Sequence, residues 1–185
     1  MLRETGVLVG YSNFWLGVRG GQRDQVLKSL GLESTGEWSD PCDTLQGVGL
    51  PTGWYLVISN FYDPQLRLPK TLMAASKDTE VVTCGFEEHS MESTASGWRD
   101  GVCTWSIEHN LNRGTWHLIT TGSLPAEFAA IRDRQISKQQ AAGGGNSGVD
   151  HIYEIAIALA QSATGFCHDR IPMDADLRCE NLRWI

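Results

Sequence analysis

The sequence lacks several features that would place it in a common class. No uninterrupted apolar run reaches the roughly 18 residues that a membrane-spanning helix needs. Basic residues are few, since 15 Lys and Arg stand against 22 Asp and Glu and the net charge is −7. Nucleic-acid-binding domains normally carry a basic patch. With 41% hydrophobic residues, the chain is too apolar for a disordered protein. We expect a globular protein with neither a membrane nor a nucleic acid as its partner.

The motifs of common enzymes and metal sites are also missing. The sequence has no C-x-x-C pair, no H-E-x-x-H, no G-x-S-x-G elbow and no phosphate-binding glycine loop. It therefore predicts no catalytic residue and no cofactor. Scattered cysteines and the absence of a recognisable signal peptide favour a cytoplasmic protein with free thiols. The five cysteines are Cys42, Cys84, Cys103, Cys167 and Cys179.

The length of 185 residues predicts a single domain spanning 1–185, because chains divide into domains only well beyond this size. No internal repeat is present. The glycine-rich segment 141–148 predicts a flexible surface loop within that domain. The 37 residues that follow it are too few to build a core of their own.

Helical spacing of apolar residues and capping residues predict four helices. The first ends at Gly31, the second follows Pro69, the third has Ser123 as its cap, and the fourth runs from Asp150 to Gly165. The predicted helices cover 22–32, 66–76, 124–131 and 152–163.

One strand-like run lies between the first and second predicted helices, and the others follow one another between the second and third. The clearest is 102–109, where apolar and polar residues alternate strictly. The pair Asp100-Gly101 is typical of a two-residue hairpin turn, which would place Trp98 opposite Cys103, Ser96 opposite Trp105 and Glu92 opposite His109. The segment 33–51 is predicted to be a loop. The fold class is therefore α+β, an antiparallel meander of about four or five strands covered on one side by three or four helices. The other predicted strands are 54–59, 80–87 and 116–121.

One polar cluster has residue types that bind metals. Glu87 and His89 would share one face of a strand, and Glu92, His109 and His117 on neighbouring strands could complete a ligand set. The alternative is a solvated strand end with a Glu–His pair. Both interpretations stay open at the level of sequence.

The tryptophans divide into two groups by their surroundings. Trp54, Trp105 and Trp116 lie in predicted strands, where they would pack against the helices. Trp38 and Trp98 lie in polar, turn-like contexts. Such residues either anchor a protein partner or fold back over the core.

Acidic residues gather in two stretches. One comprises Glu33, Glu37, Asp40 and Asp43, and the other Glu80, Glu87, Glu88 and Glu92. A solvated face is the simplest explanation, but an acidic surface with aromatic anchors would also attract a basic protein by electrostatic steering. The predicted partner-binding residues are Trp38, Asp40, Glu87, Glu88, Glu92 and Trp98.

Four segments resemble an uncharacterised family of small bacterial proteins: LPTGWYLV at 50–57, EEHSM at 87–91, SGWRDG at 96–101 and LPAEF at 124–128. This resemblance implies no activity and no catalytic residue. In size, acidity and tryptophan content the chain also resembles, more loosely, the immunity proteins that neutralise polymorphic or type VI secreted toxins.

Together these observations predict a non-enzymatic protein-binding domain of the immunity-protein kind. It would neutralise a toxin by covering the active site with an acidic, aromatic-anchored surface. Two alternatives remain: a metal-dependent protein using the His/Glu cluster, and a structural component that self-associates through exposed aromatics.

Overall fold

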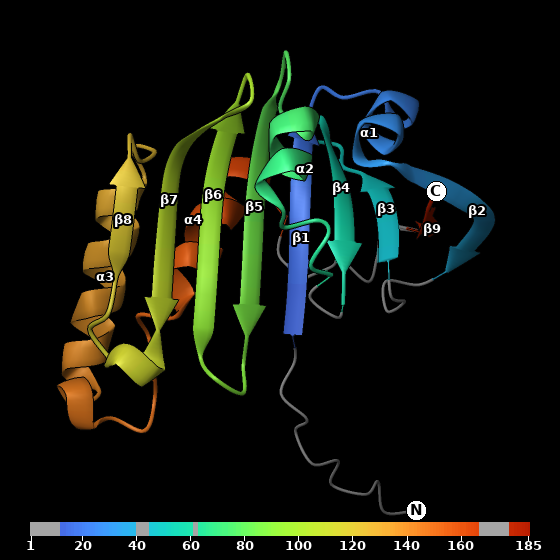
Figure 1. The fold of residues 1–185 in the computed structure, drawn as a ribbon. Coiled ribbons are helices and arrows are strands. Elements are labelled where there is room, and N and C mark those ends of the chain that lie inside the picture. Colours follow the sequence, from blue (N-terminus) through green and yellow to red (C-terminus); the bar gives the residue numbers. More distant parts are fainter. Residues whose placement is uncertain (1–11, 40–44, 61–62, 167–177) are drawn as a thin grey trace, which may run out of the picture.

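The computed structural model describes residues 12–39, 45–60, 63–166 and 178–185. Within these ranges nine antiparallel strands form one open sheet in the order β2-β9-β3-β4-β1-β5-β6-β7-β8 (Figure 1). The strands are β1 (Ser12–Arg19), β2 (Leu32–Ser39), β3 (Leu45–Gly49), β4 (Trp54–Ser59), β5 (Glu80–Glu87), β6 (Glu92–Arg99), β7 (Val102–Asn110), β8 (Ile119–Gly122) and β9 (Cys179–Trp184). The helices are α1 (Arg23–Leu30), α2 (Pro69–Ala75), α3 (Phe128–Ala141) and α4 (Glu154–Thr164), with 3-10 turns η1 (Leu111–Arg113) and η2 (Gly144–Asn146).

The helices pack on both faces of the sheet. Helices α1 and α2 cover one face, and α3 and α4 lie behind the other (Figure 1). The α+β class and the antiparallel arrangement are confirmed, but the sheet has more strands than four or five. Placing all the helices on one side was also wrong. Strands buried on both faces read as continuous apolar runs, so their sequence does not tell one covered face from two.

The central strands show why two layers form. In β1, Trp15 contributes to the core beneath α4, whereas Phe14 and Leu16 contribute to the core beneath α1 and α2. Alternate residues of a strand point to opposite faces. The predicted strand 54–59 is β4, and all six of its residues are buried.

The segment 33–51 is not the predicted loop, since most of β2 and all of β3 lie within it. Strand β9, from the end of the chain, lies between β2 and β3 and pairs with both. The buried carboxylate of Glu180 fixes β9 in place. It accepts hydrogen bonds from Arg23 Nε on α1 at 2.7 Å and from the Tyr55 hydroxyl on β4 at 2.5 Å. A buried charge requires such partners.

The predicted hairpin turn at Asp100-Gly101 is present, and Trp98 lies opposite Cys103 as expected. A bulge then shifts the register, so that Gly97 faces Trp105. A Cβ atom on Gly97 would lie 2.0 Å from Trp105 Nε1, so only glycine admits the indole there. Thr104 is the extra residue, which is typical of a bulge.

Three further expectations are corrected by the structure. Because of the bulge, Ser96 faces Ser106 and Glu92 faces Asn110, so Glu92 does not face His109. Trp116 lies before β8 and is 48% exposed, so it is not part of the core. The third predicted helix begins only at Phe128, in α3.

The end of α3 and the glycine-rich segment are joined by one side chain. Gln139 donates to the carbonyl oxygens of Gly144 at 2.7 Å and Val149 at 3.0 Å, and its own oxygen accepts from His151 N–H at 2.7 Å. The fourth predicted helix is α4, which ends at Gly165 as expected. None of the helices in the described ranges is long and apolar enough to cross a membrane.

Candidate functional site

Half of one sheet face has little cover from the helices of the described residues. Helices α1 and α2 lie over the strands from β2 to β5, whereas β6, β7 and β8 extend beyond them (Figure 1). We call the side chains of β6–β8 on this side the open face. Residues directly opposite each other on neighbouring strands share a face, so the register identifies them. They are Glu92, Thr94, Ser96, Trp98, Cys103, Ser106, Glu108, Asn110, Ile119 and Thr121.

A row of hydroxyl groups crosses the middle of the open face. Thr83 on β5 faces Ser96, Ser96 faces Ser106, and Ser106 faces Thr121. The hydroxyls of Thr83 and Ser96 are 2.6 Å apart, and those of Ser106 and Thr121 are 2.7 Å apart. Such cross-strand pairs stabilise the sheet and leave a flat, polar surface.

An acidic row closes one end of the open face. Glu87 on β5 lies directly opposite Glu92 on β6, and Glu92 lies opposite Asn110 on β7. The Asn110 amide donates to Glu92 Oε1 at 2.6 Å. Glu87 accepts from the backbone N–H of His89 at 3.0 Å, in the turn that also carries the exposed Glu88. We call Glu87, Glu88 and Glu92 the acidic row.

The negative field of this end reaches the buried side of the sheet. Tyr153, before α4, is 5% exposed. Burial, together with the charges of Glu88, Glu154 and Glu87, raises the pKa of Tyr153 above its ordinary value. Two members of the acidic row, Glu88 and Glu87, thus add to the effect of burial on Tyr153.

The six predicted partner-binding residues do not form one site. Glu87, Glu88 and Glu92 lie together, and Trp98 stands on the same face as Glu92, about 20 Å away at roughly 3.3 Å per residue. Trp38 is 54% exposed, but it lies on the edge strand β2, six strand positions from β6. That is about 29 Å at roughly 4.8 Å per strand. Asp40 lies outside the described residues.

Trp98 folds back over the core and also keeps part of its ring at the surface, where it could anchor a partner. Its ring is partly buried against the core beneath α1 and α2, and its Nε1–H donates to Ser96 Oγ at 2.8 Å. The side chain thus folds back onto the sheet while part of it stays at the surface.

The histidines proposed as metal ligands are held in other interactions. His109 is fully buried; its Nδ1 is 2.6 Å from the carbonyl oxygen of His117, and its Nε2 is 2.8 Å from Asp150 Oδ2. His117 Nδ1 accepts from Asn110 N–H at 2.9 Å. His89 lies in the exposed β5–β6 turn. In the part of the chain that the structure describes, no three His, Cys, Asp or Glu side chains converge as a metal site would require.

The pair of His109 and Asp150 has the residue types of a catalytic dyad, but both imidazole nitrogens are occupied. A carbonyl oxygen only accepts, so Nδ1 carries a proton toward His117. Asp150 Oδ1 accepts from the N–H groups of Ile152 at 3.0 Å and Tyr153 at 3.1 Å. The pair therefore joins β7 to the segment before α4, and no ring nitrogen is left for a nucleophile.

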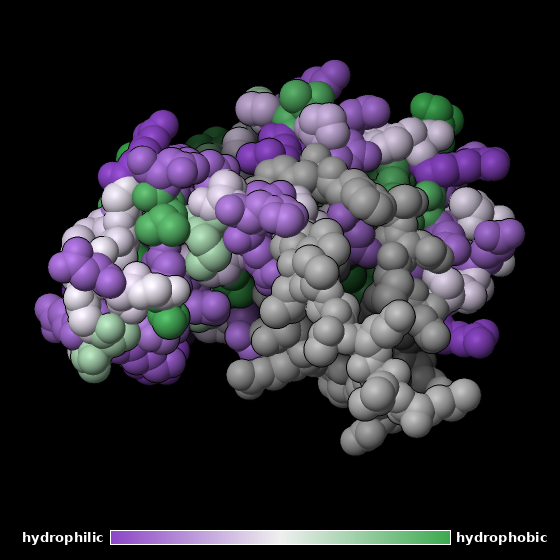
Figure 2. Space-filling model, turned by 90° about the horizontal axis from the view of Figure 1, so that it is seen from below, coloured by the Kyte–Doolittle hydropathy of each residue, from purple (hydrophilic) through white to green (hydrophobic). Residues whose placement is uncertain are grey.

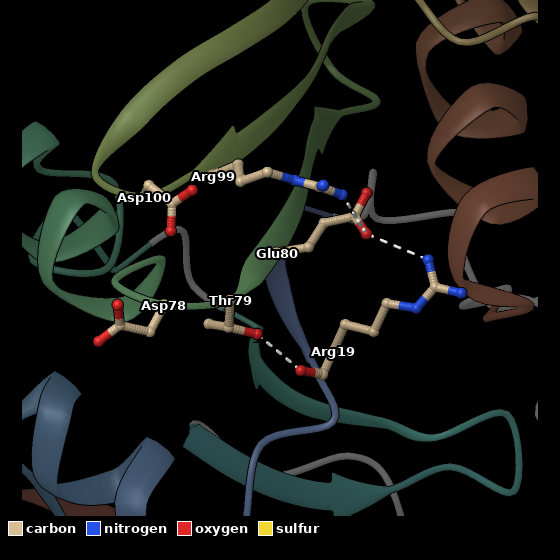
Figure 3. Close-up of a pocket in the computed structure, with 6 residues that line it drawn as sticks. All are labelled: Arg19, Asp78, Thr79, Glu80, Arg99 and Asp100. Carbon is tan, nitrogen blue, oxygen red and sulfur yellow. Dashed lines mark hydrogen bonds and ion pairs between the residues drawn. The ribbon is translucent and has the colours of Figure 1, made fainter.

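A polar depression of about 400 Å³ lies at the opposite end of β5, on the side of the β6–β7 turn (Figure 3). Glu80 stands at its centre between Arg19 Nη1 at 3.1 Å and Arg99 Nη2 at 3.3 Å. Asp78 and Asp100 line its other side. Because Glu80 neutralises part of the positive charge, these arginines do not form an anion site.

Two sets of interactions were not predicted from the sequence: the hydroxyl row, and the contact of Glu180 with Arg23 and Tyr55. Both depend on strands that are neighbours in the sheet but far apart in the chain. The alternation from Glu92 to Trp98 was the available signal for the open face, because every second residue there is polar or amphipathic.

Comparison with protein-family models, with curated proteins and with solved structures finds no match to this chain.

Proposed function

We propose that this chain is a protein-binding domain that receives a basic partner on the open face, with the acidic row as its electrostatic anchor. The observation that carries the proposal is the direct opposition of Glu87 and Glu92 at the end of a sheet face with little helical cover. Like charges opposite each other on neighbouring strands destabilise a sheet. Proteins tend to keep such an unfavourable arrangement at functional sites, so the repulsion between these two carboxylates is expected if their charge serves binding.

The net charge of the whole chain also favours a basic partner. A net charge of −7 attracts basic proteins and speeds their encounter, and a local acidic row orients them. The flat hydroxyl row beside it offers donors and acceptors that a partner surface can pair. Trp98 supplies a partly exposed aromatic ring on the same face.

The partner class that fits best is a secreted toxin with a basic active-site surface, such as an enzyme that acts on nucleic acid. An acidic domain seated on that surface would block access of the polyanionic substrate. This is the mode of action of an immunity protein, and the proposal follows the loose resemblance of the sequence to such proteins. No catalytic residue or cofactor is part of it.

The test is affinity capture from the native host with quantitative mass spectrometry. Wild-type chain is compared with the triple variant Glu87→Gln, Glu88→Gln, Glu92→Gln. The control variant Asp78→Asn, Glu127→Gln, Asp133→Asn removes the same charge at exposed positions away from the acidic row.

We expect one basic protein to be captured in stoichiometric amount by wild type and control, and to be depleted with the triple variant. Added toxin activity, measured on nucleic acid, should fall when the wild-type chain is present. Equal capture by the triple variant, or capture of acidic proteins alone, would overturn the proposal.

A further inference from the structure

The outer edge of β8 differs from the other edge of the sheet. Edge strands expose unpaired backbone groups, and proteins usually block them with charges, proline or bulges, or by keeping the edge strand very short. At the opposite edge, β2 carries Glu33 and Glu37 and has a register shift between Ser34 and Trp38. Strand β8 is only four residues long, Ile-Thr-Thr-Gly, and ends at Gly122 with φ +71°, but it carries no charge and no proline and has no register shift in its pairing with β7.

The hydrogen-bond pattern of β8 shows which backbone groups face outward. Ser123 N–H donates to the Thr104 carbonyl on β7 at 2.9 Å. In an antiparallel ladder every second residue bonds to the same neighbour. Ile119 and Thr121 therefore bond toward β7, and Thr120 and Gly122 direct their N–H and C=O groups away from the sheet.

Exposed apolar side chains gather near this edge. Ile119 at the start of β8 is 46% exposed, and Trp116 just before it lies beside η2, where a Cβ added to Gly145 would be 3.5 Å from Trp116 Nε1. Leu111 on η1 and Val149 after η2 are also exposed. Seen from below, hydrophobic residues interrupt the hydrophilic surface on the side where β7, β8 and α3 lie (Figure 2).

The geometry points to an added strand as the occupant, since outward N–H and C=O groups pair with extended backbone. A second copy of the chain fits poorly. Antiparallel pairing of two β8 strands about a two-fold axis would place both α3 helices on the same face of the joined sheet, where they would meet across the seam, because α3 extends past the edge of β8 in Figure 1. Two chains of charge −7 would also repel each other.

We propose that the outer edge of β8 accepts an extended segment of the basic partner as a tenth strand. The inference rests on the proposed function for the charge of that partner. Within the row that ends at Ile119, Glu108 is the charged residue; its side chain is 45% exposed and lies 4.0 Å from Arg113 Nη1, so a lysine would share this carboxylate with Arg113. It would stand two strand positions from the added segment, about 9.6 Å at roughly 4.8 Å per strand. A lysine opposite Ile119 would then face Glu108.

The probe is a labelled, end-capped peptide of alternating lysine and valine, about eight residues long, which is a common strand length. A glutamate–valine peptide of the same length controls for charge. Binding is followed by fluorescence anisotropy, and backbone protection by amide hydrogen exchange. The variant Thr120→Pro removes one outward N–H, which β7 does not use, so the sheet itself should be retained.

We expect saturable binding of the lysine peptide, slower exchange at the Thr120 and Gly122 amides, weaker binding of the glutamate peptide, and loss of about tenfold or more in affinity with Thr120→Pro. No saturable binding, or binding without protection of these two amides, would overturn the inference. If Thr120→Pro does not fold, the protection pattern in the wild-type chain decides.

The same titration separates this inference from the proposed function. Peptide binding that survives Glu87→Gln, Glu88→Gln, Glu92→Gln while partner capture is lost supports both, because the two surfaces then act independently. Strand addition without any basic partner in the capture experiment supports strand addition at β8 but overturns both the proposed function and the assignment of the added strand to that partner.

Discussion

Glu87 and Glu92 lie directly opposite each other on β5 and β6, at the acidic end of the open face. Opposed like charges destabilise neighbouring strands. The hydrogen bond from Asn110 to Glu92 offsets part of the repulsion but leaves both charges in place. The surface that we propose for binding is thus also a strained part of the sheet.

Replacing one member of this pair should stabilise the protein. We expect Glu87→Gln to raise the free energy of unfolding by about 0.2–1 kcal/mol, the size of a cross-strand charge effect. Urea unfolding at neutral pH measures it, and the gain should shrink at high salt. Glu127→Gln, at an exposed position outside the acidic row, serves as the control. A loss of stability with Glu87→Gln would speak against repulsion within the row.

Glu180 should make the fold sensitive to acid. Burial disfavours its charge, but hydrogen bonds from Arg23, Tyr55 and Ser34 outweigh burial and lower its pKa. A carboxyl whose pKa is lower in the folded state stabilises above its unfolded pKa of about 4.3, and this contribution is lost as pH falls through the folded pKa. Glu180→Gln should therefore flatten the loss of stability below about pH 4.3. Unfolding curves measured from neutral pH downward test this.

Removing the Glu180 side chain is expected to be severe at neutral pH. Glu180→Ala leaves the buried Tyr55 hydroxyl and the Arg23 guanidinium without their partner. We expect a loss of about 2–4 kcal/mol, less than for a fully buried pair because Arg23 reaches solvent. Glu33→Ala, in the exposed pair with Arg183, should cost less than about 1 kcal/mol. Equal losses in the two variants would contradict this assignment.

Gly97 should not tolerate a methyl group. An added Cβ would lie 2.0 Å from Trp105 Nε1, so Gly97→Ala must displace the indole or the bulge. We expect a loss of about 1–3 kcal/mol from overpacking. Gly49→Ala is the matched control, because no atom lies within 4 Å of a Cβ there. A neutral Gly97→Ala would mean that the bulge does not depend on this contact.

Asp150 should be needed for the segment before α4 to dock on β7. Asp150→Ala removes two backbone hydrogen bonds and leaves the fully buried His109 without its carboxylate. A loss of about 2–4 kcal/mol is expected. Thermal unfolding measures it, with the exposed Asp133→Ala as control. Because His109 is fully buried and lies on the other side of the sheet from the open face, neither variant should alter partner binding in a folded protein.

Some of the fold could be predicted because local patterns agree with it. The apolar stripe of 152–163 and the alternation of 102–109 both describe real elements, since burial on one face selects those periods. Strands β2 and β9 could not be predicted in this way. Their polar residues lie in a sheet only because distant partners satisfy them, as Arg23 and Tyr55 do for Glu180.

The candidate site was predictable only in part. Glu87, Glu88 and Glu92 were close enough in sequence to be recognised as a cluster. That Trp38 lies on the far edge follows from the strand order, which pairs β2 with the end of the chain. The mismatch of Glu92 with His109 follows from one bulge, and hairpin chemistry alone does not reveal a bulge.

The most direct test of the central claim is the affinity of the captured basic protein for the wild-type chain and for Glu87→Gln, Glu88→Gln, Glu92→Gln, at low and high salt. We predict a loss of about tenfold or more in the variant at low salt, with a shallower salt dependence. Equal affinity and equal salt dependence in both proteins would show that the acidic row does not bind the partner.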